Sequence, residues 1–82
     1  MLEIKKEPRF LKTIEKLKDN SLKERIKKQI KKILKNPNIG KPMKYGRKGT
    51  RELYAAPFRI SYFYDKQAKL LVFLEIYHKD KQ

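Results

Sequence analysis

The chain has 82 residues, with 23 Lys and Arg against 9 Asp and Glu, and its formal net charge is +14. A chain of this length forms one small domain, here residues 1–82, and a charge this large opposes compaction unless a polyanionic partner offsets it. The absence of cysteine excludes disulfides, thiolate metal sites and a cysteine nucleophile. No apolar run is long enough for a membrane span or a signal peptide, so we expect a cytoplasmic protein.

The N-terminal segment predicts a short strand followed by a helix. Leu2 and Ile4 alternate with polar neighbours, as in a half-buried strand. Pro8 suits the first turn of a helix, because its missing N–H has no partner to lose there. The apolar residues that follow fall on one helical face: Phe10, Leu11, Ile14 and Leu17.

A second helix is predicted after a break at residues 19–21. Ser21 and Glu24 have the spacing of a capping box, in which each side chain binds the backbone N–H of the other residue. The helix should end near Asn36, because Pro37 disfavours helical geometry in the residue before it. Two helices with so short a connection predict an αα-hairpin. The apolar residues of the second helix are Leu22, Ile26, Ile30, Ile33 and Leu34.

The second half of the chain predicts a loop and three strands. Prolines and glycines mark residues 36–49 as a loop. A period of two then predicts strands at residues 51–55, 58–64 and 70–77, the last apolar on both faces and therefore covered on both. The order β-α-α-β-β-β predicts an α+β fold, an antiparallel sheet with the N-terminal helical hairpin packed on one face.

The positive charge is concentrated in the middle of the chain. Residues 20–51 carry twelve cations against one acid, Glu24, a net charge of +11, whereas residues 52–78 are electrically balanced. A solvated helix face and thermal adaptation are alternative explanations, but both normally come with matching acids, which are scarce here. This concentration of positive charge suits binding to the phosphate backbone of a nucleic acid. The candidate nucleic-acid-binding residues are Lys28, Lys31, Lys32, Lys35, Lys41, Lys44, Arg47 and Lys48, with Tyr77 as an aromatic contact.

Arg59 is the most informative single residue, since it stands among apolar and aromatic neighbours in a strand. It either pairs with Glu52 or Glu75, or presents a guanidinium fork to a phosphate. His78 ends the last strand, and an imidazole beside a cation and a carboxylate would suffice for RNA cleavage without a metal. The sequence has no metal-ligand spacing, P-loop or dinucleotide motif, so we expect no cofactor.

Four tyrosines occupy strand positions: Tyr54, Tyr62, Tyr64 and Tyr77. Most tyrosines at strand spacing belong to the core, whereas an exposed one can stack on an unpaired base. We expect one or two of the four to be exposed.

Three segments, in this order and spacing, resemble the RelE/ParE superfamily of toxins from type II toxin–antitoxin systems. They are the loop NPNIGKPMK (36–44), the hairpin RELYAAPFRISYFYD (51–65) and the last strand LLVFLEIYHK (70–79). The resemblance covers nearly the whole chain. It implies a toxin that a small, partly disordered antitoxin neutralises by wrapping around it with an acidic or amphipathic segment.

The resemblance also implies roles for single residues. Arg59 matches the strand arginine that contacts the scissile phosphate in the RNase branch of the superfamily. His78 matches a C-terminal histidine that acts in members ending in Tyr-His, here as general acid or base. Lys79 stands where other members have a phosphate-binding cation, and Arg51 would assist electrostatically.

The resemblance does not identify the general base, because the best-studied branch carries lysines at the positions of Glu52 and Tyr54. Our first hypothesis is a ribosome-dependent, metal-free endoribonuclease that cleaves mRNA by attack of a 2′-hydroxyl and docks on ribosomal RNA through its basic helix and loop. The second hypothesis is a DNA gyrase inhibitor, as in the ParE branch. The third is an RNA-binding module without catalytic activity.

Overall fold

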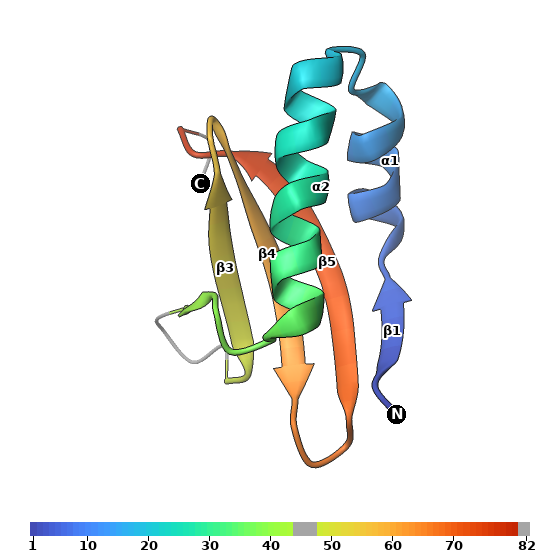
Figure 1. Ribbon diagram of the computed structural model, residues 1–82, viewed down its shortest axis with the longest axis vertical. Helices are drawn as coiled ribbons and strands as arrows, with labels where there is room; N and C mark the ends of the chain where they lie inside the picture. Colours follow the sequence, from blue (N-terminus) through green and yellow to red (C-terminus); the bar gives the residue numbers. More distant parts are fainter. Residues whose placement is uncertain (44–47, 81–82) are drawn as a thin grey trace.

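The structure, a computed structural model, describes residues 1–43 and 48–80. In chain order its elements are β1 (Glu3–Lys6), α1 (Pro8–Lys16), α2 (Asn20–Lys35), β2 (Lys41–Pro42), β3 (Thr50–Ala55), β4 (Phe58–Asp65) and β5 (Leu70–His78). The strands form one sheet in the order β1-β5-β4-β3-β2, and the two helices pack against it (Figure 1). The predicted α+β fold class and the helical hairpin are confirmed. In the described residues no helix is long and apolar enough to cross a membrane.

The sheet differs from the prediction at its two edges. β1 runs parallel to β5, whereas all other pairings are antiparallel. β2 is a two-residue strand inside the predicted loop, and it pairs with β3. Alternation of Leu2 and Ile4 predicted β1 but not its direction, because no tight turn connects β1 to its partner. β2 has only two residues, which is too short for alternation to reveal it.

α2 begins two residues earlier than the predicted capping box requires. Asp19 Oδ1 accepts the backbone N–H groups of Ser21 and Leu22 at 2.8 and 3.2 Å, so Asp19 is the N-cap. The prediction that Ser21 caps the helix was wrong, because a carboxylate two residues earlier already accepts from the first turn. The helix ends at Lys35 with Asn36 as its C-cap, as Pro37 predicted.

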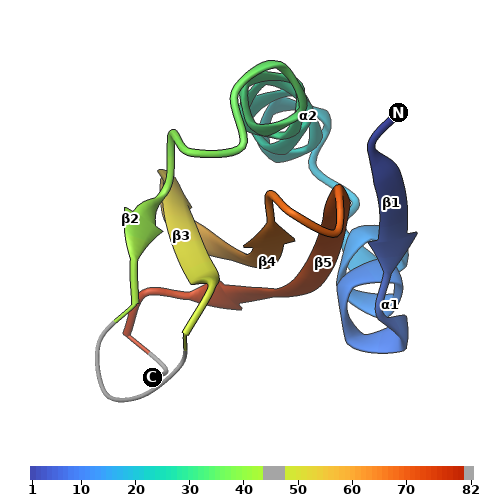
Figure 2. The same ribbon diagram turned by 90° about the horizontal axis from the view of Figure 1, so that it is seen from below.

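Residues alternate between the two faces of the sheet, and the helices cover one of them. Figure 2 shows α2 across one side of the sheet and α1 beside β5. On this covered face Phe10 stacks on Phe73, with ring centres 5.0 Å apart. The opposite face, here called the open face, carries no helix in the described chain, so Leu70 and Val72 are half-buried there rather than covered. The buried hydrophobic residues are Phe10, Ile26, Ile33, Ala55, Ile60, Tyr62, Leu71, Phe73 and Ile76.

An irregularity in β5 changes which of its residues reach the open face. The successive cross-strand pairs Tyr62–Phe73 and Ser61–Glu75 leave Leu74 as an extra residue between them. A bulge of this kind advances one strand by a residue and reverses its alternation beyond that point. The residues of β5 beyond the bulge that lie on the open face are therefore those that uninterrupted alternation would place on the covered face.

A buried hydroxyl fixes the loop after α2 to the sheet. Tyr62, which is fully buried, donates its hydroxyl proton to the carbonyl of Pro37 at 2.7 Å and accepts the N–H of Gly40 at 2.9 Å. Arg51 Nη1 donates to the carbonyls of Asn38 at 3.0 Å and Gly40 at 2.7 Å. These five residues, here called the Tyr62 clamp, hold the chain where β2 begins.

The capping assignment predicts different outcomes for two neighbouring substitutions. Asp19→Ala should lower the free energy of unfolding by about 1 kcal/mol, because the first turn of α2 loses its acceptor. Ser21→Ala is the matched control and should change it by less than about 0.5 kcal/mol, since the Ser21 side chain is exposed. Urea unfolding followed by circular dichroism measures both. A larger loss for Ser21→Ala than for Asp19→Ala would contradict the assignment.

Candidate functional site

Neighbouring strands bring five side chains to one hollow of the open face. Strand pairing sets Lys41 opposite Glu52 and Tyr54 opposite Arg59, and cross-strand partners point to the same face. The N–H of Lys79 donates to a backbone carbonyl at 3.1 Å, which ties the end of β5 to the start of β4. The hollow measures about 420 Å³ and is here called the open-face site. It is lined by Lys41, Glu52, Tyr54, Arg59 and Lys79.

Three side chains of the open face form one hydrogen-bonded group. Arg59 Nη1 donates to Glu52 Oε1 at 3.0 Å, and the Tyr77 hydroxyl donates to Glu52 Oε2 at 2.5 Å. Tyr77 reaches this group because it is the cross-strand partner of Arg59. The structure thus has the ion pair with Glu52 that the sequence offered as one alternative for Arg59, whereas Glu75 pairs with Arg9 at 4.0 Å.

The electrostatics of the open-face site favour an anion. Lys41, Arg59 and Lys79 surround a single carboxylate, so the lining has a positive balance. A guanidinium has five N–H donors, and the bond to Glu52 leaves donors that can bind an anion. Partial burial raises the pKa of Tyr77 above its ordinary value of 10.0, and the bond to Glu52 and its charge raise it further against the lowering effect of Arg59. The phenol is therefore protonated at neutral pH and acts as a donor.

His78 lies on the covered face and not beside Arg59. Its cross-strand partner is Phe58, whose ring meets the imidazole edge-on with centres 5.9 Å apart. His78 Nδ1 accepts the N–H of Asp80 at 3.3 Å. A catalytic role for His78 depended on its lying near Glu52 and Arg59. Those two residues meet, but the bulge in β5 turns Tyr77 toward the open face and His78 away from it.

Two other residues assigned to the site lie in different surroundings. Arg51 is the cross-strand partner of the buried Tyr62, and its guanidinium belongs to the Tyr62 clamp rather than to the open-face site. Tyr54 lines the open-face site and is 48% exposed. Tyr62 is fully buried, and Tyr64 and Tyr77 are half-buried. One exposed tyrosine of the four agrees with the expectation of one or two.

The remaining predicted cations lie on α2 or in the loop after it. Those of the helix are exposed: Lys28, Lys31, Lys32 and Lys35. Lys48 is also exposed, whereas Lys44 and Arg47 lie outside the described residues. Because α2 covers the face opposite the open-face site, the basic helix and that site lie on opposite sides of the sheet (Figure 2).

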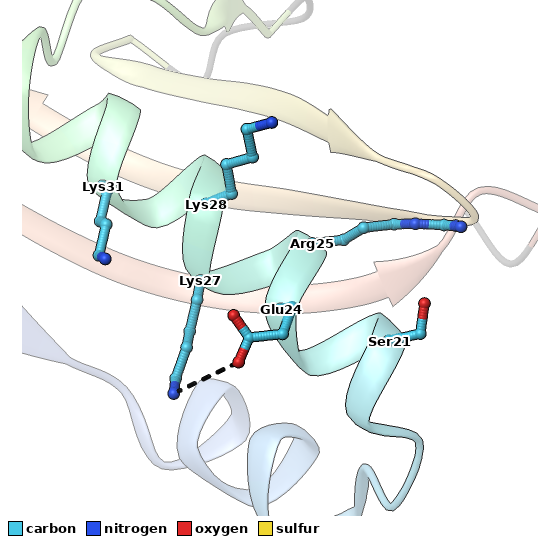
Figure 3. A pocket seen from close by; sticks show the side chains of 6 residues that line it. All are labelled: Ser21, Glu24, Arg25, Lys27, Lys28 and Lys31. Carbon is cyan, nitrogen blue, oxygen red and sulfur yellow. Dashed lines mark ion pairs between the residues drawn. The ribbon is translucent and has the colours of Figure 1, made fainter.

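Figure 3 shows a second hollow, of about 590 Å³, on the outer side of α2. It is lined by Ser21, Glu24, Arg25, Lys27, Lys28 and Lys31, which all come from one helix. Lys27 pairs with Glu24 at 3.9 Å, and Arg25 Nη1 donates to the carbonyl of Ala56 at 2.9 Å. The side chains spread from the helix in different directions, so this larger hollow is a solvent-facing cationic surface rather than an enclosed site.

Sequence reasoning missed two features of the site. The first is the bond between Tyr77 and Glu52, which joins residues 25 positions apart in the chain and depends on the register of β5. The second is the Tyr62 clamp, which has no local signal because the two residues bound by the Tyr62 hydroxyl lie more than twenty residues away along the chain. Among the described residues, no three His, Cys, Asp or Glu side chains gather as a group of metal ligands.

Comparison with known proteins identifies relatives of this fold. The family model of the ParE toxin of type II toxin–antitoxin systems matches residues 4–82. The isolated RelE toxin of E. coli is 17% identical with a TM-score of 0.79, over 100% of this chain and 88% of that chain. The YoeB/ParE toxin from Agrobacterium tumefaciens is also 17% identical with a TM-score of 0.79, over 94% and 98% of the two chains.

An archaeal structure has the same fold. RelE of Pyrococcus horikoshii, crystallised in a complex with RelB, is 13% identical with a TM-score of 0.73, over 99% of this chain and 98% of that chain. No curated protein sequence matches the chain.

Two tyrosines should lose their protons late in an alkaline titration. Burial raises the pKa of Tyr62 above 10.0, ahead of the lowering effects of Gly40 and Arg51, and the pKa of Tyr77 is raised as well. The folded state therefore holds these protons more tightly than the unfolded state. Their stabilisation is complete below the unfolded pKa and is lost as the pH rises through the folded values.

Ultraviolet absorbance of tyrosinate measures this directly. Tyr62→Phe and Tyr77→Phe should each remove part of the late-titrating amplitude. If the absorbance change late in the titration is the same in both variants as in the parent, these two hydroxyls are not the groups whose pKa the fold raises.

Proposed function

The chain belongs to the ParE toxin family of the RelE/ParE superfamily, the toxins of type II toxin–antitoxin systems, and from this premise we propose that it is a metal-free endoribonuclease that cleaves mRNA on the ribosome. The observation that carries the proposal is the open-face site. Lys41, Arg59 and Lys79 supply positive charge beside a carboxylate and a protonated phenol, within reach of an open hollow. Cleavage of RNA needs these same groups: a base, an acid and cations for the phosphate.

The reaction that fits these groups is an internal transesterification. The Glu52 carboxylate takes the proton of a 2′-hydroxyl, whose oxygen forms a bond to the adjacent phosphorus. Arg59 and the two lysines stabilise the extra negative charge of the phosphorane. The bond from phosphorus to the 5′-oxygen breaks, and Tyr77 gives its proton to that oxygen and regains one from Glu52. The products are a 2′,3′-cyclic phosphate and a 5′-hydroxyl end, and no co-reactant is needed.

In this proposal Glu52 and Tyr77 replace His78 as the groups that move protons. His78 faces Phe58 on the covered side of the sheet, so it lies away from a phosphate held by Arg59. Tyr54 offers an exposed aromatic ring beside the same hollow, on which an unpaired base can stack. Arg51 serves the Tyr62 clamp and has no direct part in the reaction.

The outer surface of α2 supports a docking role in the same proposal. Its exposed lysines carry a charge that suits the phosphates of ribosomal RNA, on the side of the sheet away from the open-face site. The molecule would then contact the ribosome with one side and the mRNA with the other. A cognate antitoxin with an acidic or amphipathic segment is the partner that we propose for neutralisation, because structural neighbours of this chain were crystallised with RelB.

Arg59→Ala should lower the rate of mRNA cleavage at least about a hundredfold, the scale on which enzymes lose rate when a donor to a developing oxyanion is removed. His78→Gln is the matched control and should stay within about twofold of the parent, because its side chain lies on the other face. Primer extension on translated mRNA gives the rate, and mass spectrometry of the fragments should find 2′,3′-cyclic phosphate ends.

Two results would overturn this assignment. If His78→Gln loses activity and Arg59→Ala does not, the open-face site is not the catalytic site. If Arg59→Ala and the parent arrest growth equally, the toxicity does not come from phosphate chemistry at Arg59.

Inhibition of DNA gyrase is the second candidate function, and the match to the ParE family model favours it. It requires no catalysis, and Arg59 would then serve mainly as the ion-pair partner of Glu52. A supercoiling assay with purified protein separates the two functions. Loss of gyrase supercoiling with intact mRNA would support inhibition of gyrase, whereas cleaved mRNA with normal supercoiling would support the endoribonuclease.

A further inference from the structure

We propose that Tyr62 is a positioning residue of the open-face site and acts through Lys41, although the two side chains lie on opposite faces of the sheet. The inference rests on the proposed function, for which Lys41 supplies a phosphate-binding charge. The connection between them is the backbone of the loop that the Tyr62 clamp holds.

Apart from the Tyr62 clamp, few contacts fix the position of Lys41. It belongs to a strand of two residues at the edge of the sheet, and its side chain is exposed. The pairing of β2 with β3 sets it opposite Glu52, and one further backbone bond follows, from the N–H of Met43 to the carbonyl of Thr50 at 3.0 Å. So short an edge strand frays readily unless a neighbouring contact holds it.

The Tyr62 clamp is that contact, because it ends at the residue immediately before Lys41. Gly40 gives its N–H to the Tyr62 hydroxyl and its carbonyl to Arg51, so both of its backbone polar groups are held. Because its one donor and its one acceptor are both bound, the peptide planes on either side of Gly40 are fixed, and with them the direction in which the chain enters β2.

The fit around Gly40 leaves no room for a side chain at this position. A Cβ atom placed on Gly40 would lie 2.5 Å from the Tyr62 hydroxyl oxygen and 3.0 Å from the carbonyl oxygen of Glu52. The loop is thus packed directly between the tyrosine of the covered face and the backbone of a residue that lines the open-face site. A shift at the hydroxyl is transmitted to Lys41 through this contact.

The variant that tests the inference is Tyr62→Phe, which keeps the ring and removes only the hydroxyl. Cleavage of mRNA should fall about fivefold, the factor that one net hydrogen bond typically carries. Tyr64→Phe is the matched control: Tyr64 lies on the same face of the same strand and packs against the same core, and the hydroxyl hydrogen bonds of the Tyr62 clamp come from Tyr62 alone. It should stay within about twofold of the parent.

A double-mutant cycle with Lys41→Ala distinguishes positioning from general destabilisation. If Tyr62 acts through Lys41, adding Tyr62→Phe to Lys41→Ala should cause no further loss of activity. A merely structural role would lower activity by the same factor in both backgrounds, and that result would overturn the inference. Binding of a single-stranded RNA oligonucleotide, measured against salt concentration, should show the same non-additivity in affinity.

Amide hydrogen exchange keeps the inference testable even if the chain cleaves no RNA. In Tyr62→Phe the N–H groups of Gly40 and Met43 should exchange faster than in the parent, while amides in the middle of β4 and β5 keep their rates. Unchanged exchange at Met43 would overturn the positioning role whatever the activity. Faster exchange at Met43 without any cleavage by the parent would retain the positioning role and reject the endoribonuclease.

Discussion

Side-chain alternation along β3, β4 and β5 is the constraint on which the rest of the molecule depends. It sends Ile60 and Tyr62 into the core under the helices and sends Arg59 to the open face. Since both helices pack on one face, the other is free to carry a hydrogen-bonded group of arginine, glutamate and tyrosine beside a solvent-open hollow. The Tyr62 clamp links the two faces, because its buried hydroxyl on one side sets the course of the strand that carries Lys41 on the other.

The charge of the chain is divided by the same sheet. The exposed lysines of α2 carry much of the excess on the side of the sheet away from the open-face site, whereas the site itself has three cations around one carboxylate. The ion pair between Arg59 and Glu52 is partly exposed, with side-chain exposures of 32% and 21%, and pairs of this kind contribute little to stability. Its value lies instead in holding a guanidinium and a carboxylate in fixed positions next to a site that attracts anions.

The sequence predicted those parts of the structure that depend on local pattern. The helical hairpin followed from apolar spacing around Ile26 and Ile33, and the two faces of β4 followed from a period of two. The helix cap was misread because Asp19 and Ser21 are both good caps, and only the geometry of the chain entering α2 chooses between them. The Tyr62 clamp and the bond between Tyr77 and Glu52 join residues distant in sequence, so their formation depends on packing and register that no local pattern records.

The bulge at Leu74 has an evolutionary consequence. Loss of this single codon would restore uninterrupted pairing between β4 and β5 and leave Tyr77 opposite Arg59 and His78 opposite Phe58, because Leu74 is the residue without a cross-strand partner. Continuous pairing with Leu74 retained would instead exchange the faces of the residues from Glu75 to His78 and set Ile76 opposite Arg59. The presence of a phenol beside that guanidinium therefore depends on the register of one strand as well as on the identity of its residues.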